Sequence, residues 1–218
     1  GIDDCFAALE DNWHAANASA TSFNQIAIRD DSPWRKGVGI ASCWYGCGNT
    51  SLPNPSTMRM GITADGRIVL HQGAMDIGQG ANTVITQIAA DAFGVPVHDV
   101  QILGGDTDLT PDCGKTSASR QTFVSGKAAM LSGMALREMV LRHGNVDANA
   151  KIAFDGAALT LADSVGGTLR IALADMPVND YGYVFMAEET YDPPTSPLDE
   201  KGQGLPYAVF GYGAQMVE

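Results

Sequence analysis

The chain has 218 residues, 45% of them hydrophobic and 17% charged, so it can bury a core and is not expected to be disordered. Thirteen basic side chains against 25 acidic ones give a formal net charge of -12, which argues against a surface that binds nucleic acid or an anionic membrane. The sequence contains no run of about 18 apolar residues and no basic N-terminal region, so neither a membrane-spanning helix nor a signal peptide is predicted.

The cysteines do not indicate a metal site. Only Cys43 and Cys47 lie close together, and the four histidines form no second pair that could complete a tetrahedral zinc site. We expect reduced thiols in a cytoplasmic protein, with a disulfide or a bound metal as the alternative.

The N-terminal half begins with an expected amphipathic helix over residues 3–18. Its apolar residues recur at steps of three and four: Cys5, Phe6, Leu9, Trp13 and Ala16. Residues 19–36 are polar and indicate a linker, and residues 37–47 indicate a buried strand followed by a loop over 48–56.

A hairpin and the first of two main helices come next. Strands at 58–64 and 67–73 flank Asp65 and Gly66, a pair typical of a two-residue type I′ turn. A helix is predicted from residue 82 or 83 to 93, with Gly94 as its C-terminal glycine.

The second half alternates loops and strands around one further helix. After a short strand at 100–103, residues 104–118 have no hydrophobic period and predict a long loop, a kind of segment that is often functional. A second main helix is expected over 119–143. Further strands are expected at 151–155, 158–161, 168–171, 182–191 and 207–218.

These elements predict an α+β fold with mixed sheets and two main helices that follow ligand-facing loops. We expect three segments: an N-terminal helix and linker (1–36), a ligand-binding core (37–145) and a strand-rich segment (146–218). Because the chain begins without methionine and stops inside a strand, we expect it to be a piece of a larger assembly.

Several familiar motifs fail on context. The Gly-Lys-Thr run at 114–116 lacks the glycine that a phosphate-binding P-loop needs, because Leu109 stands in that place. The Gly-Val-Gly run at 37–39 lies within a strand and does not predict a dinucleotide fold. The Asp-Thr-Asp run at 106–108 is typical of a turn, with a divalent metal as the less favoured alternative.

The most informative feature is a pair of segments that each precede a main helix. Residues 76–82 read Asp-Ile-Gly-Gln-Gly-Ala-Asn, and residues 119–121 read Ser-Arg-Gln. The first turn of a helix has unpaired N–H groups and a partial positive charge, which favour phosphates and other anions. Gly78 and Gly80 leave room for a ligand at the backbone, and Gln79 supplies an amide.

In the second segment, Ser119 offers a hydroxyl, Arg120 a guanidinium fork for a phosphate and Gln121 an amide. Ordinary helix capping by Asn82 and Ser119 is the alternative explanation of both segments, and the residues by themselves leave it open.

Four runs together resemble the molybdenum-binding subunit of the xanthine dehydrogenase and aldehyde oxidoreductase family. They are KGVGIASCWYGCG from residue 36, DGRIVLHQGAMDIGQGANTVITQIAADAFGVP from residue 65, TPDCGKTSASRQTFVSGKAA from residue 110 and the stretch 191–218. The resemblance covers residues 35–145 and 180–218 well, and their order and spacing agree with that family.

The resemblance implies roles for both segments. The Gly78-Gln79-Gly80 turn and Ala81 would approach the molybdenum, with Gln79 acting beside the metal, and Ser119, Arg120 and Gln121 would contact the pterin dinucleotide. The implied cofactor is molybdopterin cytosine dinucleotide carrying molybdenum. The metal would be held by the sulfurs of the cofactor, so no protein ligand to a metal is expected.

The resemblance also implies the chemistry and the partners. The family hydroxylates an aldehyde or an N-heterocycle oxidatively, and electrons leave through 2Fe-2S clusters and often FAD, which we expect on other segments or subunits. The family's general base is a glutamate in a G-x-G-E segment that is absent here, and Glu188, Glu189 and Glu218 are poor substitutes. We therefore expect the remaining molybdenum-binding segment, an iron–sulfur subunit and often a flavin subunit as partners.

A second hypothesis is a structural or assembly module that keeps the fold without a bound cofactor. The substrate is not predicted by the sequence, because aldehydes, purines and other N-heterocycles all fit the resemblance.

Overall fold

The computed structural model describes residues 1–47, 51–205 and 208–217, and the chain divides into two compact units. Unit 1 comprises Gly1–Cys47 and Ala208–Glu218, and unit 2 comprises Gly48–Tyr207. This division differs from the boundaries expected after residues 36 and 145. The reason is that a strand before residue 48 pairs with a strand at the far end of the chain.

Unit 1 contains helix α1 (Ile2–Arg29) and a two-stranded antiparallel ribbon of β1 (Gly39–Cys47) and β9 (Ala208–Val217). Gly39 lies opposite Val217, and the register slips between Tyr45 and Gly46. The prediction of a strand near each of these positions is confirmed, although residues 207 and 218 lie outside the described residues.

The predicted linker over 19–36 is wrong, because α1 continues to Arg29. The spacing of three and four also continues, through Ala20, Phe23 and Ala27, and neither glycine nor proline interrupts it before Pro33. The prediction of a buried strand at 37–47 is also wrong for the side chains that are described. Residues 39–43 of β1 are exposed, because a two-stranded ribbon covers little of its own surface.

Unit 2 is built on a four-stranded mixed sheet in the order β4-β3-β2-β8. Its strands are β2 (Ser56–Thr63), β3 (Ile68–Gln72), β4 (Val100–Gly104) and β8 (Tyr183–Tyr191). β2 is antiparallel to β3 and β8, whereas β3 and β4 are parallel. The parallel pair is possible because helix α2 (Ala81–Phe93) connects β3 to β4.

The hairpin between β2 and β3 is confirmed, but its turn type is not the predicted one. Gly66 has φ +85°, while Asp65 is not among the residues with positive φ, so the turn is not type I′. The Gly66 N–H donates to Thr63 O, and the Thr63 N–H donates to Arg67 O. This is a three-residue loop that closes with glycine in the left-handed region, the next most common hairpin connection.

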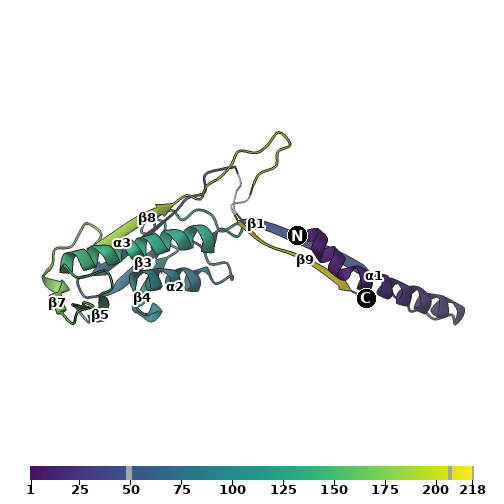
Figure 1. Cartoon of the computed structure of the whole chain (residues 1–218), viewed down its shortest axis with the longest axis horizontal. Helices are drawn as coiled ribbons and strands as arrows, with labels where there is room; N and C mark the ends of the chain where they lie inside the picture. Colours follow the sequence, from purple (N-terminus) through teal and green to yellow (C-terminus); the bar gives the residue numbers. More distant parts are fainter. Residues whose placement is uncertain (48–50, 206–207, 218) are drawn as a thin grey trace. The chain divides into compact units, whose positions relative to one another are not determined.

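Helices α2 and α3 (Gly126–Gly144) cover one face of this sheet (Figure 1). Alternate strand residues meet the helices in a core of fully buried side chains, which include Met58, Met60, Ile62, Leu70, Ile85, Phe93 and Leu136. The two helices approach closely at Gly133, where an added Cβ would lie 2.7 Å from Ala89 O. Gly94 ends α2 in the left-handed conformation, as predicted.

A separate antiparallel sheet of β5 (Lys151–Asp155), β6 (Ala158–Ala162) and β7 (Thr168–Ala172) follows α3. Short helical turns lie at η1 (Val97–Asp99), η2 (Gln121–Ser125) and η3 (Leu173–Asp175). The α+β fold with mixed sheets is thus confirmed. No helix in the described residues is long and apolar enough to cross a membrane.

Candidate functional site

The first predicted segment forms the loop between β3 and α2. Gly78 has φ +104° and Gly80 has φ +83°, both in the left-handed region that favours glycine. An added Cβ at either position would meet no described atom within 4 Å, so the space over this loop is open. Gly80 is the N-cap of α2, and Ala81 is the buried first residue of the helix.

Asp76 satisfies the N–H groups at the start of α2. Its carboxylate accepts hydrogen bonds from the N–H groups of Gly78 (2.9 Å), Gly80 (3.3 Å) and Asn82 (3.0 Å). The bonds from Asn82 and Gly78 in particular lower the pKa of Asp76, so it is a carboxylate at neutral pH. Capping of α2 by Asn82, the alternative explanation of this segment, is not what the structure has: Gly80 is the N-cap, and the Asn82 N–H donates to Asp76.

Gln79 is exposed at the tip of the loop and folds back onto it. Its Oε1 accepts from the Ile77 N–H at 2.7 Å, and its Nε2 donates to Met75 O at 3.4 Å.

A cleft of about 410 Å³ lies beside this loop, at the carboxyl ends of the parallel strands β3 and β4. Ligands of α/β sheets commonly bind at such ends. The cleft is lined by Ala74, Met75, Asp76, Asn82, Ile102, Gly104 and Gly105.

The loop over 104–118 is fixed to the sheet at several points. The thiol of Cys113 donates to Thr57 O (3.0 Å) and accepts from the Gly73 N–H (3.1 Å), and the Thr57 N–H donates to Asp112 O (2.9 Å). Burial raises the pKa of Cys113, which keeps the thiol protonated as a donor. The same loop therefore bridges the start of β2 and the end of β3.

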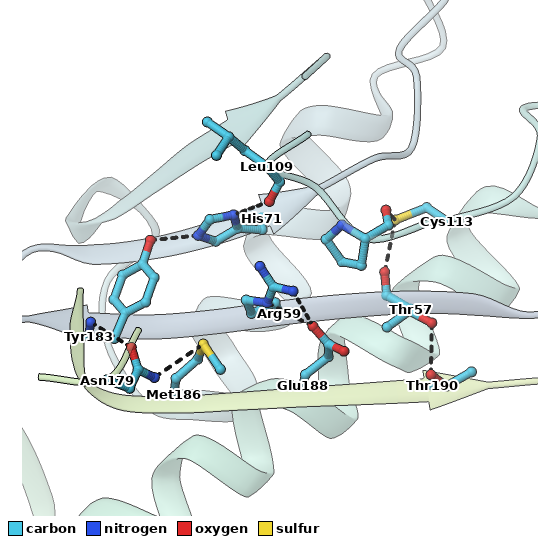
Figure 2. A network of polar contacts seen from close by, with 11 residues as sticks. Thr57, Arg59, His71, Leu109, Cys113, Asn179, Tyr183, Met186, Glu188 and Thr190 are labelled. Carbon is cyan, nitrogen blue, oxygen red and sulfur yellow. Dashed lines mark hydrogen bonds and ion pairs between the residues drawn. The ribbon is translucent and has the colours of Figure 1, made fainter. Parts of the chain in front are cut away.

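His71 holds this loop from the outer face of the sheet, as Figure 2 shows. Its Nδ1 lies 2.8 Å from Leu109 O and its Nε2 lies 2.5 Å from the Tyr183 hydroxyl. A carbonyl can only accept, so Nδ1 carries the proton and Nε2 accepts from the tyrosine. Burial lowers the pKa of His71, and this favours the neutral ring that both bonds require.

An ion pair lies beside His71 on the same face. Arg59, whose side chain is 11% exposed, pairs with Glu188 at 2.7 Å (Figure 2). Its guanidinium also lies over the ring of Tyr181. Glu188 is thus held by an arginine in the sheet. The sequence analysis did not detect this cluster, because its members lie far apart in the chain and share no local pattern.

The second predicted segment is less regular than expected. Ala118 and Ser119 have φ values of +51° and +49°, which are uncommon for residues other than glycine. Ser119 is exposed, and a π-helical turn over Gln121–Ser125 precedes α3, which begins at Gly126. The helix predicted from about residue 119 therefore begins later, as α3 at Gly126 after the π-helical turn, and Ser119, the alternative N-cap, precedes both elements.

Arg120, which the sequence offers as a guanidinium fork for a phosphate, is fully buried. Its Nη1 donates to the carbonyl oxygens of Cys113 (2.6 Å) and Lys115 (3.1 Å). Its Nη2 donates to the carbonyl oxygens of Asn54 (3.0 Å) and Pro55 (2.7 Å). The guanidinium thus joins the segment before β2 to the loop before α3.

Gln121 is buried as well, and its amide binds inside the protein. Its Nε2 donates to the hydroxyl of Thr116 at 2.9 Å, and its Oε1 accepts from the hydroxyl of Ser125. The Thr116 hydroxyl donates to Met75 O at 2.7 Å. The structure therefore brings the two predicted segments together through Thr116, a residue that the sequence analysis did not select.

Protein ligands for a metal are not gathered in the part of the chain that is described, where no group of three or more His, Cys, Asp or Glu side chains converges. In the Asp-Thr-Asp run, the carboxylate of Asp106 accepts from the N–H groups of Asp108 and Leu109. These hydrogen bonds form a turn, which is the interpretation that the sequence favours over a divalent metal site.

The chain belongs to the family of molybdopterin cofactor-binding domains, whose family model matches residues 8–218. The resemblance described from the sequence is thereby confirmed. Among curated relatives, the putative xanthine dehydrogenase molybdenum-binding subunit XdhA of Escherichia coli strain K12 is 38% identical over 115 residues, 51% of this chain and 15% of that protein. The xanthine dehydrogenase of Oryza sativa is 25% identical over 213 residues, 95% of this chain and 14% of that protein.

Solved structures agree with this fold. The aldehyde oxidoreductase from Desulfovibrio gigas matches with a TM-score of 0.62 and 23% identity, over 98% of this chain and 20% of that one. A Cu,Mo-CO dehydrogenase matches with a TM-score of 0.55 and 20% identity, over 88% of this chain and 26% of that one. The chain therefore spans only a small part of the length of its relatives.

Proposed function

We propose that this chain forms one wall of a molybdopterin site in a molybdenum hydroxylase. Gly78, Gln79, Gly80 and Ala81 would line the cofactor together with Ser119, while Arg120 and Gln121 would support that wall from inside the protein. The observation that carries the proposal is the open loop at Gly78 and Gly80. There the backbone is left-handed, and no described atom lies within 4 Å of an added Cβ.

The residues present fit such a group. An extended pterin ligand needs backbone that it can approach closely, which the two glycines provide. It also needs polar groups on a rigid frame, which Gln79 and Ser119 provide on loops held by Asp76 and Thr116. When bound, the cofactor supplies two-electron oxidative hydroxylation chemistry. The chain's own part is to bind the cofactor, orient it and exclude water from it.

The finer features of the proposal are the cytosine dinucleotide form, an aldehyde or N-heterocycle as substrate, and partners that carry 2Fe-2S clusters, FAD and the G-x-G-E glutamate. They are supported by the resemblance and by relatives named as xanthine dehydrogenase and aldehyde oxidoreductase. A cytoplasmic location is part of the same proposal. Free thiols at Cys5, Cys43 and Cys113 are compatible with it.

The first test measures molybdenum and acid-released cytidine nucleotide in the protein purified from its native host with its co-purifying subunits. Roughly equimolar metal and nucleotide support the proposal. A folded protein that carries neither, and no larger partner, contradicts it and favours the structural module instead.

Gln79→Ala is expected to lower turnover about 10- to 100-fold while molybdenum content stays at the wild-type level, because it removes one positioned amide beside the reacting group. Thr83→Ala, an exposed change in the first turn of α2, is the matched control. Wild-type turnover in the Gln79 variant would contradict a role for this side chain beside the metal.

A further inference from the structure

We infer that Thr116 is a positioning residue that sets the spacing between the two cofactor loops. The inference rests on the proposed function, and it adds to it a residue that lies outside both predicted segments. The observation behind it is a chain of hydrogen bonds that runs from the start of β2 to the Gly-Gln-Gly loop and passes through the Thr116 hydroxyl.

Every hydrogen bond in this chain runs from donor to acceptor in the same direction, from Ser56 toward Met75. The Ser56 hydroxyl donates to Ser125 Oγ at 2.8 Å, and the Ser125 hydroxyl donates to Gln121 Oε1. The other end of the same amide, Gln121 Nε2, donates to Thr116 Oγ1 at 2.9 Å. The Thr116 hydroxyl then donates to Met75 O at 2.7 Å. In this arrangement each hydroxyl donates once and accepts from the preceding link where there is one, as its chemistry allows.

The two links at Ser125 are buried, the link from Gln121 to Thr116 is partly buried, and the link from Thr116 to Met75 is exposed. Ser56 and Ser125 are fully buried, and Gln121 is 6% exposed. Hydrogen bonds in such surroundings are stronger than in water, and neighbouring bonds polarise one another. Loss of the partner of Gln121 Nε2 would be costly, because a residue that is only 6% exposed has little access to water that could replace that partner.

Thr116 itself is held from the opposite side. The Arg120 guanidinium binds the carbonyl oxygens of Cys113 and Lys115, which precede Thr116. Gly114 makes room for this contact, because an added Cβ would lie 2.7 Å from Arg120 Nη1. The hydroxyl of Thr116 therefore projects from a rigid backbone and not from a loose loop.

The far end of the hydrogen-bond chain reaches the residue that the proposed function places beside the metal. Met75 O accepts from Thr116 Oγ1 and also from Gln79 Nε2, at 3.4 Å. Displacing the Met75 carbonyl therefore loosens the backbone that leads into Gly78 and Gly80, in addition to the anchor of the Gln79 side chain. A wall that is already ordered before the cofactor binds loses less conformational entropy on binding. Thr116 thus favours cofactor retention without touching the cofactor.

The test compares three variants of the native assembly. Thr116→Val keeps the shape of the side chain and removes the hydroxyl, and Thr116→Ser keeps the hydroxyl. Thr107→Val makes the same change at an exposed threonine of the same loop and serves as the matched control. Two quantities are measured: amide hydrogen exchange of the peptide covering residues 73–82, and the rate at which molybdenum is lost during dialysis.

We expect Thr116→Val to raise both the exchange of this peptide and the rate of molybdenum loss about tenfold, the effect of one or two lost hydrogen bonds. Thr116→Ser and Thr107→Val should stay within about twofold of the wild type. Recovery with serine identifies the hydroxyl as the cause, and a serine variant that behaves like valine overturns the inference.

The remaining outcomes separate the inference from the proposed function. If exchange rises in Thr116→Val but molybdenum loss does not, the bridge is only structural and the inference is overturned while the proposed function stands. Unchanged exchange overturns the bridge itself. A wild-type assembly that carries no molybdenum overturns the proposed function and, with it, the role of Thr116 in retention, whatever the exchange rates are.

Discussion

Arg120 and His71 are two of the polar side chains that fix the loop between β4 and α3, and each does so from a buried position. Arg120 binds backbone carbonyls of two segments, and His71 binds one carbonyl and one tyrosine. Buried polar groups contribute to stability only while their partners are in place, so substitutions at these positions should have large effects.

Arg120→Lys is expected to lower the free energy of unfolding by about 3 kcal/mol or more, because one ammonium group cannot reach four carbonyl oxygens. Urea unfolding followed by far-ultraviolet circular dichroism measures the loss, because the three tryptophans all lie in unit 1 and would not report on unit 2. Arg142→Lys is the matched control, since Arg142 is exposed and pairs with Glu138 on the surface, and it should change stability by less than about 0.5 kcal/mol. Equal effects of the two changes would contradict the carbonyl-binding role of Arg120.

His71 should make the stability of unit 2 depend on pH. Its pKa in the folded protein lies below the ordinary value of 6.5, because burial disfavours the charged ring. Its contribution is therefore complete above about pH 6.5 and decreases as the pH falls toward the lower folded pKa, since the unfolded state takes up the proton first. Urea midpoints measured between pH 7.5 and pH 5 should fall in the wild type, and this fall should be smaller in His71→Gln. An identical fall in both proteins would be evidence against His71 as its source.

Only part of this site could be predicted from the sequence. The Gly-Gln-Gly turn has a local pattern, so its position before a helix and its left-handed backbone follow from the residues alone. The burial of Arg120 depends on a segment distant in sequence, which includes Asn54. The hydrogen bond from the Asn82 N–H to Asp76 depends on the conformation of the loop between them. Periodicity and motif spacing carry no information about such contacts.

At the level of elements, two Asp-Gly turns touch one another in unit 2. An added Cβ at Gly66, which lies between β2 and β3, would be 1.9 Å from the carbonyl oxygen of Gly156, which lies between β5 and β6. Gly66 also has φ +85°, so it meets both a conformational and a steric restriction. This contact connects the main sheet to the small sheet.

Gly66→Ala should therefore destabilise the protein by more than about 3 kcal/mol, whereas a left-handed backbone alone costs an alanine about 1–2 kcal/mol. Gly166→Ala isolates that second cost, because Gly166 has φ +96° and no described atom lies within 4 Å of an added Cβ. The difference between the two unfolding free energies measures the contact between the turns. If both variants lose the same amount, the turns do not touch in solution.

Elements with a strong local period were the predictable ones. The β2–β3 hairpin, α2 and the three strands of the small sheet form where their patterns place them. The predicted end of the first helix at residue 18 is too early, because the three-and-four spacing continues through the polar residues that follow Ala18. The π-helical turn before α3 is not predicted, because strained backbone at Ala118 and Ser119 is set by the contacts of the loop and not by helix propensity.

Over the whole molecule, the two units differ in how much they bury. The described hydrophobic residues buried in unit 1 are three alanines of α1: Ala16, Ala20 and Ala27. Unit 2 contains a continuous core that includes Phe93, Met60 and Leu136, each 0% exposed. Burial of large apolar side chains provides most of the stabilising free energy of a folded protein. Unit 1 therefore gains much less stabilising free energy from burial than unit 2.

Native-state hydrogen exchange should therefore separate the two units. Amides of α1 are expected to exchange through local opening at least about 100-fold faster than amides of α2 and α3, a difference of about 3 kcal/mol in opening free energy. Phe93→Ala, which creates a cavity in the core of unit 2, should remove about 3–5 kcal/mol from the protection of α2 and α3. The same change should leave α1 exchange within about twofold. If α1 and α2 are equally protected from exchange in the chain studied alone, then the stability of α1 does not follow from the side chains that α1 buries.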